Sequence, residues 1–198
     1  MVKDIQDKII RLKQSNDVCI LAHSYMSEEI CEIADFTGDS YALAVKAMSV
    51  SQKTVVMCGV RFMAETVKML SPDKKVILSH PDAGCPMAEQ FDRKYIEQIK
   101  DKYKGYAVVA YVNTTADIKA VSDVCVTSSS AVKICRAIPE KSILFIPDIN
   151  LGRYVAEQIP EKHFEFIAGG CPVHSNIGVE EALKAKAAHP SALLLVHP

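Results

Sequence analysis

The chain has 198 residues, of which 49% are apolar, and it carries 23 basic and 24 acidic side chains for a formal net charge of −1. This is enough apolar material for one large core or two smaller ones, while the balanced charge gives no reason to expect nucleic acid or an anionic membrane as a partner. No apolar stretch approaches the roughly 20 residues that span a bilayer. The charged residues 1–4 lack a signal-peptide core, so we expect a cytoplasmic protein.

Short apolar runs alternate with helical patterns along the chain. The runs predict buried strands at residues 18–22, 54–57, 76–78, 107–110, 124–126, 143–146, 164–167 and 192–196. Apolar residues at helical spacing predict helices at residues 5–14, 40–47, 63–70, 93–102, 131–137, 153–158 and 179–188. Because the strands are apolar throughout, we expect parallel sheets covered by helices on both faces. The predicted fold class is α/β, built from three-layer αβα domains.

Two short sequence features recur along the chain at intervals of 86 to 88 residues. Apolar runs end at His23, Tyr111 and His197, and the tripeptide Gly-Cys-Pro contains Cys85 and Cys171. Self-similarity at a fixed period indicates repeated structural units. A third cysteine in this register would fall near residue 257, beyond the end of the chain.

We therefore expect pseudo-symmetric repeated domains. The first spans residues 1–90, the second spans residues 91–190, and residues 191–198 begin a third. A shorter similarity relates residues 75–82 to residues 141–148, 66 positions later, and predicts that the copies are not strictly collinear.

Seven cysteines are many for a reduced compartment, and an odd count without a secretion signal argues against a disulfide framework. Cysteine within a strand or helix usually behaves as a small buried hydrophobe. Five positions fit that description: Cys19, Cys31, Cys58, Cys125 and Cys135. Cys85 and Cys171 instead lie in Gly/Pro turns after strands, where a thiol can face a cleft.

Polar side chains follow the predicted strands, and a parallel sheet collects such groups beyond its carboxyl ends. They are His23, Tyr25, Ser40, Tyr111, Asn113, Ser128, His174 and His197. Neutral imidazole, phenol, amide and hydroxyl groups bind carboxylates and move protons near neutral pH. A single histidine after a strand is more often structural, but recurrence in separate copies favours a functional role for His23, Tyr111 and His197.

Two turns precede predicted helices, at residues 35–40 and at the Ser-rich residues 127–130. Each can simply cap its helix or receive an anion on free N–H groups, and both interpretations stay open. The chain has no Gly-rich dinucleotide fingerprint and no Walker loop, so a nucleotide site is not expected.

Cys85 and Cys171 suggest two hypotheses about a bound metal, zinc or an iron–sulfur cluster. Cys171 and His174 have a spacing compatible with zinc, although structural zinc usually takes its ligands in close pairs. Single cysteines contributed once per repeat fit better an iron–sulfur cluster held on a threefold axis between domains. Three thiolates on a four-iron cluster leave one iron open as a Lewis acid.

Ordered motifs from about residue 20 onward resemble the quinolinate synthase family. The matching segments are 22–25 (AHSY), 33–40 (IADFTGDS), 58–65 (CGVRFMAE), 83–88 (AGCPMA), 110–114 (AYVNT), 125–131 (CVTSSSA) and 170–174 (GCPVH). The resemblance implies three pseudo-symmetric α/β domains, two of them largely present here, and a [4Fe–4S] cluster bound by one cysteine from each. It also implies that iminoaspartate and dihydroxyacetone phosphate condense to quinolinate in NAD biosynthesis, with loss of two waters and phosphate. L-aspartate oxidase would then supply the iminoaspartate.

The resemblance assigns roles by motif. Cys85 and Cys171 are the implied cluster ligands. The residues implied to hold substrate carboxylate or phosphate oxygens are His23, Ser40, Ser128 and His174. The residues implied to line the reacting centre are Tyr25, Tyr111, Asn113 and His197, with Tyr25 the candidate for proton transfer during enolisation.

Three departures from the family pattern stand out. Ser130 occupies a position where the family usually has Asn, the chain has no Trp, and it ends at Pro198, before the third domain and its cysteine. We therefore expect an incomplete form of the enzyme, inactive by itself. Two alternatives remain: a non-catalytic two-domain module with zinc on Cys85, Cys171 and His174, and a cluster-free α/β lyase acting on a sugar phosphate.

Overall fold

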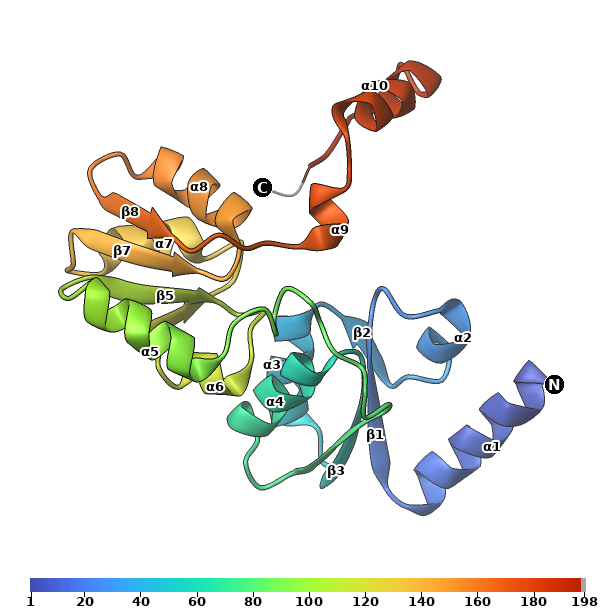
Figure 1. Cartoon of the computed structure of the whole chain (residues 1–198). Coiled ribbons are helices and arrows are strands. Elements are labelled where there is room, and N and C mark those ends of the chain that lie inside the picture. The colour runs from blue at the N-terminus through green and yellow to red at the C-terminus, as the bar shows by residue number, and fades with distance from the viewer. Residues whose placement is uncertain (197–198) are drawn as a thin grey trace. The chain divides into compact units, whose positions relative to one another are not determined.

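The structure, a computed structural model, describes residues 1–196. The chain divides into two compact units, residues 1–88 and Glu89 onward. Each unit contains one four-stranded parallel sheet flanked by helices (Figure 1). The predicted α/β class with αβα layering is therefore confirmed.

The first unit has strand order β2-β1-β3-β4. Its strands are β1 (Val18–His23), β2 (Phe36–Gly38), β3 (Thr54–Cys58) and β4 (Lys75–Leu78). Its helices are α1 (Val2–Ser15), α2 (Glu28–Cys31), α3 (Ser40–Ser49) and α4 (Arg61–Leu70).

The second unit has the same order one repeat later, β6-β5-β7-β8. Its strands are β5 (Ala107–Tyr111), β6 (Val124–Val126), β7 (Ser142–Ile146) and β8 (His163–Phe166). Its helices are α5 (Arg93–Lys102), α6 (Ala116–Lys119), α7 (Ala131–Ala137), α8 (Ile149–Gln158), α9 (Pro172–Ser175) and α10 (Val179–Ala188).

Each sheet buries both of its faces, which explains why its strands are apolar throughout. In the first unit, Leu21 and Met57 pack with residues of α3 and α4 on one face, while Ile20 packs with residues of α1 and α2 on the other. In the second, Phe145 and Leu144 belong to the two corresponding clusters on opposite faces. Burying a side chain of this size stabilises the fold by about 1.5–3 kcal/mol.

The repeat extends to a matching charged contact in both units. In the first, Asp35 accepts hydrogen bonds from the Ile20 N–H (2.8 Å) and from Lys13 Nζ (2.9 Å). The equivalent residues make the same contact in the second unit, where Asp123 accepts from the Val108 N–H (2.8 Å) and from Lys100 Nζ (2.7 Å). Each aspartate thereby joins the first helix of its unit to the neighbouring strand.

The copies are collinear, so the prediction of a rearranged repeat is wrong. Residues 75–82 begin with β4, at the edge of its sheet, whereas residues 141–148 contain β7, which lies between two strands. The 66-residue similarity therefore relates non-equivalent strands that share only an apolar run and a Pro-Asp turn.

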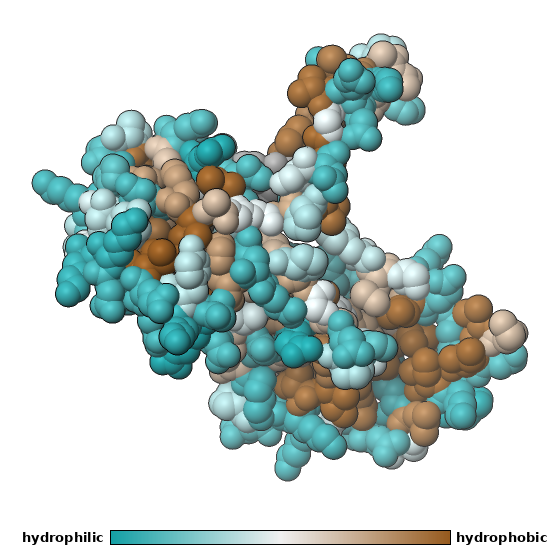
Figure 2. Space-filling model, in the orientation of Figure 1, coloured by the Kyte–Doolittle hydropathy of each residue, from teal (hydrophilic) through white to brown (hydrophobic). Residues whose placement is uncertain are grey.

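The strand predicted at residues 192–196 is also wrong. No described strand pairs with this segment, and Leu193 and Leu195 are 89% and 87% exposed. A strand needs a hydrogen-bonded neighbour and a face to bury. The preceding helix α10 likewise buries no residue, and its Val179 and Leu183 are exposed. Figure 2 shows apolar side chains on the surface of this helix.

Smaller differences concern short elements and one cysteine. Residues 36–38, expected within a turn, form β2, and the four-residue helices α2, α6 and α9 were too short for a periodic signal. Cys19, Cys58 and Cys135 are buried as predicted, and burial raises the pKa of the Cys19 and Cys135 thiols to about 11. Cys31 is half-buried, and Cys125 is exposed because β6 is an edge strand.

Among residues 1–196, none of the helices combines the length and apolar character that crossing a lipid bilayer requires.

Candidate functional site

The candidate residues of the first unit lie at the carboxyl ends of its parallel strands. His23 ends β1 in register with Gly38 at the end of β2, and the Ser24 N–H donates to the Gly38 carbonyl (3.0 Å). Ser40 follows two residues later as the first residue of α3. The register therefore brings the β1 turn, with His23 and Tyr25, beside the start of α3.

The imidazole of His23 has a defined tautomer. Its Nδ1 accepts a hydrogen bond from the Tyr25 N–H (3.1 Å), which places the ring proton on Nε2. Burial lowers the pKa of His23, and Asp39 opposes that effect only in part. The ring is therefore neutral near pH 7 and offers one N–H donor. Tyr25 packs edge-on to it, with ring centroids 4.7 Å apart, and is itself 91% exposed.

The start of α3 is capped from within. Asp39 Oδ1 accepts hydrogen bonds from the Tyr41 N–H (3.0 Å) and the Ala42 N–H (2.7 Å). Because a carboxylate already occupies these two donors, an incoming anion would not find them available. The group that this turn can offer to a substrate oxygen is then the Ser40 hydroxyl.

The loop that carries Cys85 is tied to α4. The Arg61 N–H donates to the Ala83 carbonyl (2.8 Å), two residues before the thiol, and Arg61 Nη2 donates to the Pro81 carbonyl (3.0 Å). A hydrogen bond from the Gly84 N–H to the Asp82 carbonyl (2.8 Å) tightens the turn. Cys85 is half-buried and packs against the apolar core on the α3 and α4 face.

The second unit repeats this arrangement with different side chains. Tyr111 ends β5 in register with Val126, and the Val112 N–H donates to the Val126 carbonyl (2.8 Å). The amide of Asn113 donates to the Tyr111 hydroxyl oxygen (3.1 Å). The phenol proton of Tyr111 is therefore directed away from Asn113.

The Ser-rich turn lies next to this pair. The Thr127 N–H donates to Ser130 Oγ (2.9 Å) and the Ser130 N–H donates to Thr127 Oγ1 (3.2 Å), so the two residues close the turn on each other. Ser129 also contacts Thr127. This network does not include the side chain of Ser128, which is half-buried at the same end of the sheet.

The loop that carries Cys171 is tied to α8 in the same way as the first loop is tied to α4. The Ile149 N–H donates to the Gly169 carbonyl (3.0 Å), again two residues before the thiol. Cys171 is half-buried at the cap of α9, which begins with Pro172, and His174 lies exposed within α9.

Each unit thus gathers its own half of the predicted residues at one edge of its sheet. The first places His23, Tyr25, Ser40 and Cys85 after its strands, and the second does the same with Tyr111, Asn113, Ser128 and Cys171, whereas His174 lies farther along the chain in α9. His197 lies outside the described residues. Sequence reasoning missed Arg61 as a support of the first cysteine loop, since a helix-start arginine carries no pattern that announces such a contact.

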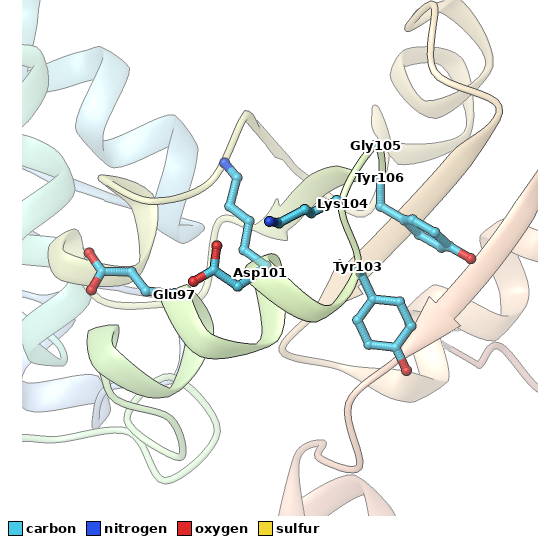
Figure 3. A pocket seen from close by; sticks show the side chains of 7 residues that line it. Glu97, Asp101, Tyr103, Lys104, Gly105 and Tyr106 are labelled. Carbon is cyan, nitrogen blue, oxygen red and sulfur yellow. The ribbon is translucent and has the colours of Figure 1, made fainter.

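An open hollow of the second unit lies away from these residues. Residues at the end of α5 and before β5 line a volume of about 380 Å³, at the amino end of the strand (Figure 3). In this view Glu97 and Asp101 lie on one side and the rings of Tyr103 and Tyr106 on the other. None of the candidate residues borders it, and its carboxylates sit beside lysines in an exposed groove, so we do not assign the function to it.

The side chains that could bind a metal allow the zinc and iron–sulfur hypotheses to be compared. Within residues 1–196, no three or more His, Cys, Asp and Glu side chains are gathered as a group that would hold a metal ion. Thiolate is the protein donor that iron–sulfur clusters take, and Cys85 and Cys171 are free, half-buried thiols on supported turns. The donor chemistry of each thiol fits such a cluster.

This chain is similar to known proteins over its whole length. The family described as "Quinolinate synthetase A protein" matches residues 7–198. The quinolinate synthase of Caldicellulosiruptor saccharolyticus is 48% identical over 197 residues, and that of Pelobacter propionicus is 46% identical over 198. The quinolinate synthase of Aquifex aeolicus is 44% identical over 197 residues. In each case all of this chain is covered, but it spans only 65%, 65% and 61% of the relative's length, respectively.

Proposed function

From the premise that this chain belongs to the quinolinate synthetase A family, we propose that it takes part in quinolinate synthesis. In that reaction iminoaspartate and dihydroxyacetone phosphate condense, with loss of two waters and phosphate. The observation that carries the proposal is the matched placement of one supported thiol and several oxygen-binding groups at the carboxyl edge of each sheet. The substrates belong to a cytoplasmic NAD pathway, with L-aspartate oxidase as the source of iminoaspartate.

Both substrates are rich in carboxylate or phosphate oxygens, and the chain offers neutral donors for them. His23 presents its Nε2–H, because Nδ1 is engaged by the Tyr25 N–H. Ser40 and Ser128 add hydroxyl groups, and His174 adds a second imidazole. A neutral donor binds an anion without the desolvation cost of burying a second charge.

The tyrosines are suited to proton transfer. Tyr25 stands edge-on to His23, so a phenol and an imidazole lie within reach of one substrate carbon. Asn113 holds the oxygen of Tyr111 and directs its proton outward, which suits donation to a leaving hydroxyl. In this assignment Tyr25 moves the proton during enolisation, while Tyr111, Asn113 and His197 line the reacting centre.

Cys85 and Cys171 would hold a [4Fe–4S] cluster. When bound, the cluster would supply Lewis-acid activation of a substrate hydroxyl or carboxylate oxygen. The chain's own contribution is to present the two thiols from fixed turns, each tied by the first N–H of a helix two residues upstream.

A chimera tests the proposal independently of chain length. The matching 65% of the Caldicellulosiruptor saccharolyticus enzyme is replaced by this chain, and the product is reconstituted with iron and sulfide without oxygen. Incubation with both substrates should yield quinolinate, detected by mass spectrometry, and Tyr25→Phe should reduce the rate by on the order of 10²–10⁴.

The same preparation separates the alternatives. A folded chimera that loads iron but makes no quinolinate would contradict the proposal. A colourless chain that retains zinc and no iron would favour the binding module. Turnover that persists in air after both cysteines are replaced would favour the cluster-free lyase.

A further inference from the structure

Gln90 lies at the start of the second unit, before α5, and is half-buried. Its side chain is used at both ends. Nε2 donates to the Pro147 carbonyl (3.0 Å), and Oε1 accepts from the Gly170 N–H (3.2 Å). One amide therefore joins the turn after β7 to the loop after β8.

Both contacts fall on residues next to functional or structural turns. Pro147 directly precedes Asp148, whose buried carboxylate caps α8 by accepting from the Asn150 N–H (2.9 Å). Gly170 directly precedes Cys171. The Gln90 amide is thus one residue away from the backbone that carries the thiol.

The glycine before Gly170 shows how close this approach is. A Cβ atom on Gly169 would overlap the side-chain oxygen of Gln90 and the ring of Phe91. With a side chain at position 169, the Gln90 amide would have to move from the place where it meets the loop. The Gly-Gly pair ahead of Cys171 therefore has a packing reason in addition to its turn.

We propose that Gln90 is a positioning residue that fixes the orientation of the Cys171 thiol for cluster binding. The role requires a donor and an acceptor on the same side chain, which an amide provides and a carboxylate does not. This inference rests on the proposed function, in which Cys171 is a ligand, but it makes a claim about the chain without metal.

Thiol labelling tests the claim in the apo protein. The reagent 4,4′-dithiodipyridine reacts with thiols at acidic and neutral pH, and the labelling rate of Cys171 is divided by that of Cys85 in the same molecules. Gln90→Met keeps the side-chain length and removes both hydrogen bonds. We expect the Cys171/Cys85 ratio to rise about tenfold, while Gln98→Met, the same change on the exposed face of α5, leaves it unaltered.

A second variant adds a pH signature that general loosening would not produce. In Gln90→Glu the introduced carboxylate cannot donate to the Pro147 carbonyl at pH 8. At pH 3.5, below the ordinary glutamate pKa of about 4.3, most of the side chain is a protonated acid that can both donate and accept, as the amide does. The ratio should therefore be high at pH 8 and return toward the wild-type value at pH 3.5. Gln90→Met should remain high at both pH values.

Hydrogen exchange of the Gly170 amide in the wild-type chain tests the contact without a variant that could fail to fold. In the wild-type chain the Gly170 amide should exchange at least tenfold more slowly than a free peptide; exchange at the free rate overturns the proposal. Equal labelling ratios in wild type, Gln90→Met and Gln90→Glu also overturn it. If the ratios change as expected but the reconstituted chimera makes no quinolinate, the proposed function fails while the positioning role stands.

Discussion

The two units keep the same scaffold and differ in the side chains that complete it. Strand order, the Lys–Asp contact and the helix N–H bound two residues before each cysteine occur in both. The first unit adds His23 with Tyr25 at its central strand, and the second adds Tyr111 with Asn113 at the matching position. The fold therefore fixes where chemistry can occur, while individual residues decide which chemistry each copy contributes.

The supports of the two cysteine loops differ as well. Arg61 reaches the Pro81 carbonyl from the exposed surface of the first unit, whereas Gln90 bridges two loops from a half-buried position in the second. An exposed bond competes with water and contributes little. We therefore expect the second loop to depend more on its side-chain support than the first.

The largest expected effect concerns iron loading. In the reconstituted chimera, Cys85→Ser and Cys171→Ser should each abolish most of the retained iron, because each removes a thiolate ligand of the cluster. Cys125→Ser, which replaces an exposed thiol on the edge strand β6, is the matched control and should retain wild-type iron. Iron and sulfide assays measure the outcome. Equal loss in all three variants would contradict the assignment.

Core truncation should destabilise the two units to a similar extent. Met57 and Phe145 occupy equivalent positions on the central strands β3 and β7 and are fully buried. We expect Phe145→Ala to cost about 3–5 kcal/mol and Met57→Ala about 2–5 kcal/mol of unfolding free energy. Urea unfolding followed by circular dichroism measures both. A cost below about 1 kcal/mol at either position would show that the sheets are not equivalent cores.

A smaller effect should appear as a pH dependence of stability. Burial alone would raise the pKa of Asp123, but the hydrogen bonds from Lys100 and the Val108 N–H outweigh it, so the pKa lies below its ordinary value. This contribution is present above the unfolded value of about 3.9 and is lost as the pH falls through the lower folded value. Asp123→Asn should therefore flatten the loss of stability between pH 6 and pH 3, measured as the urea midpoint. An unchanged slope would be inconsistent with the contact.

The smallest effect concerns the titration of His23. Burial lowers its pKa, so NMR should show it titrating below 6.5, with the proton on Nε2 in the neutral form. Asp39 favours the charged ring, and Asp39→Asn should lower the pKa further. Titration above 6.5, or a proton on Nδ1, would remove the basis for a neutral donor at this position.

Much of the fold could be predicted because the sequences of buried parallel strands are continuously apolar. Residues 124–126 form a strand and residues 93–102 form a helix, each with the predicted bounds. Residues 36–38 were missed because three residues around a polar Thr37 give no periodic signal. Residues 192–196 were predicted wrongly because apolarity alone does not supply a pairing partner.

Some residues of the candidate site could likewise be predicted from the sequence, and others could not. His23 and Tyr111 could be proposed because strand ends repeat at a fixed spacing. Arg61 and Gln90 could not, since their bonds join residues 20 and 80 positions apart, and only the folded chain brings these together. Cys125 was expected to be buried, and its exposure follows from the place of β6 at a sheet edge.

The most direct test reads all seven thiols in one experiment. The chimera, which supplies the rest of the relative's sequence, is alkylated before and after anaerobic reconstitution with iron and sulfide, and peptides are quantified by mass spectrometry. We predict that Cys85 and Cys171 lose reactivity together and that none of this chain's other cysteines becomes protected. Protection of only one of the two, or of neither, would contradict it.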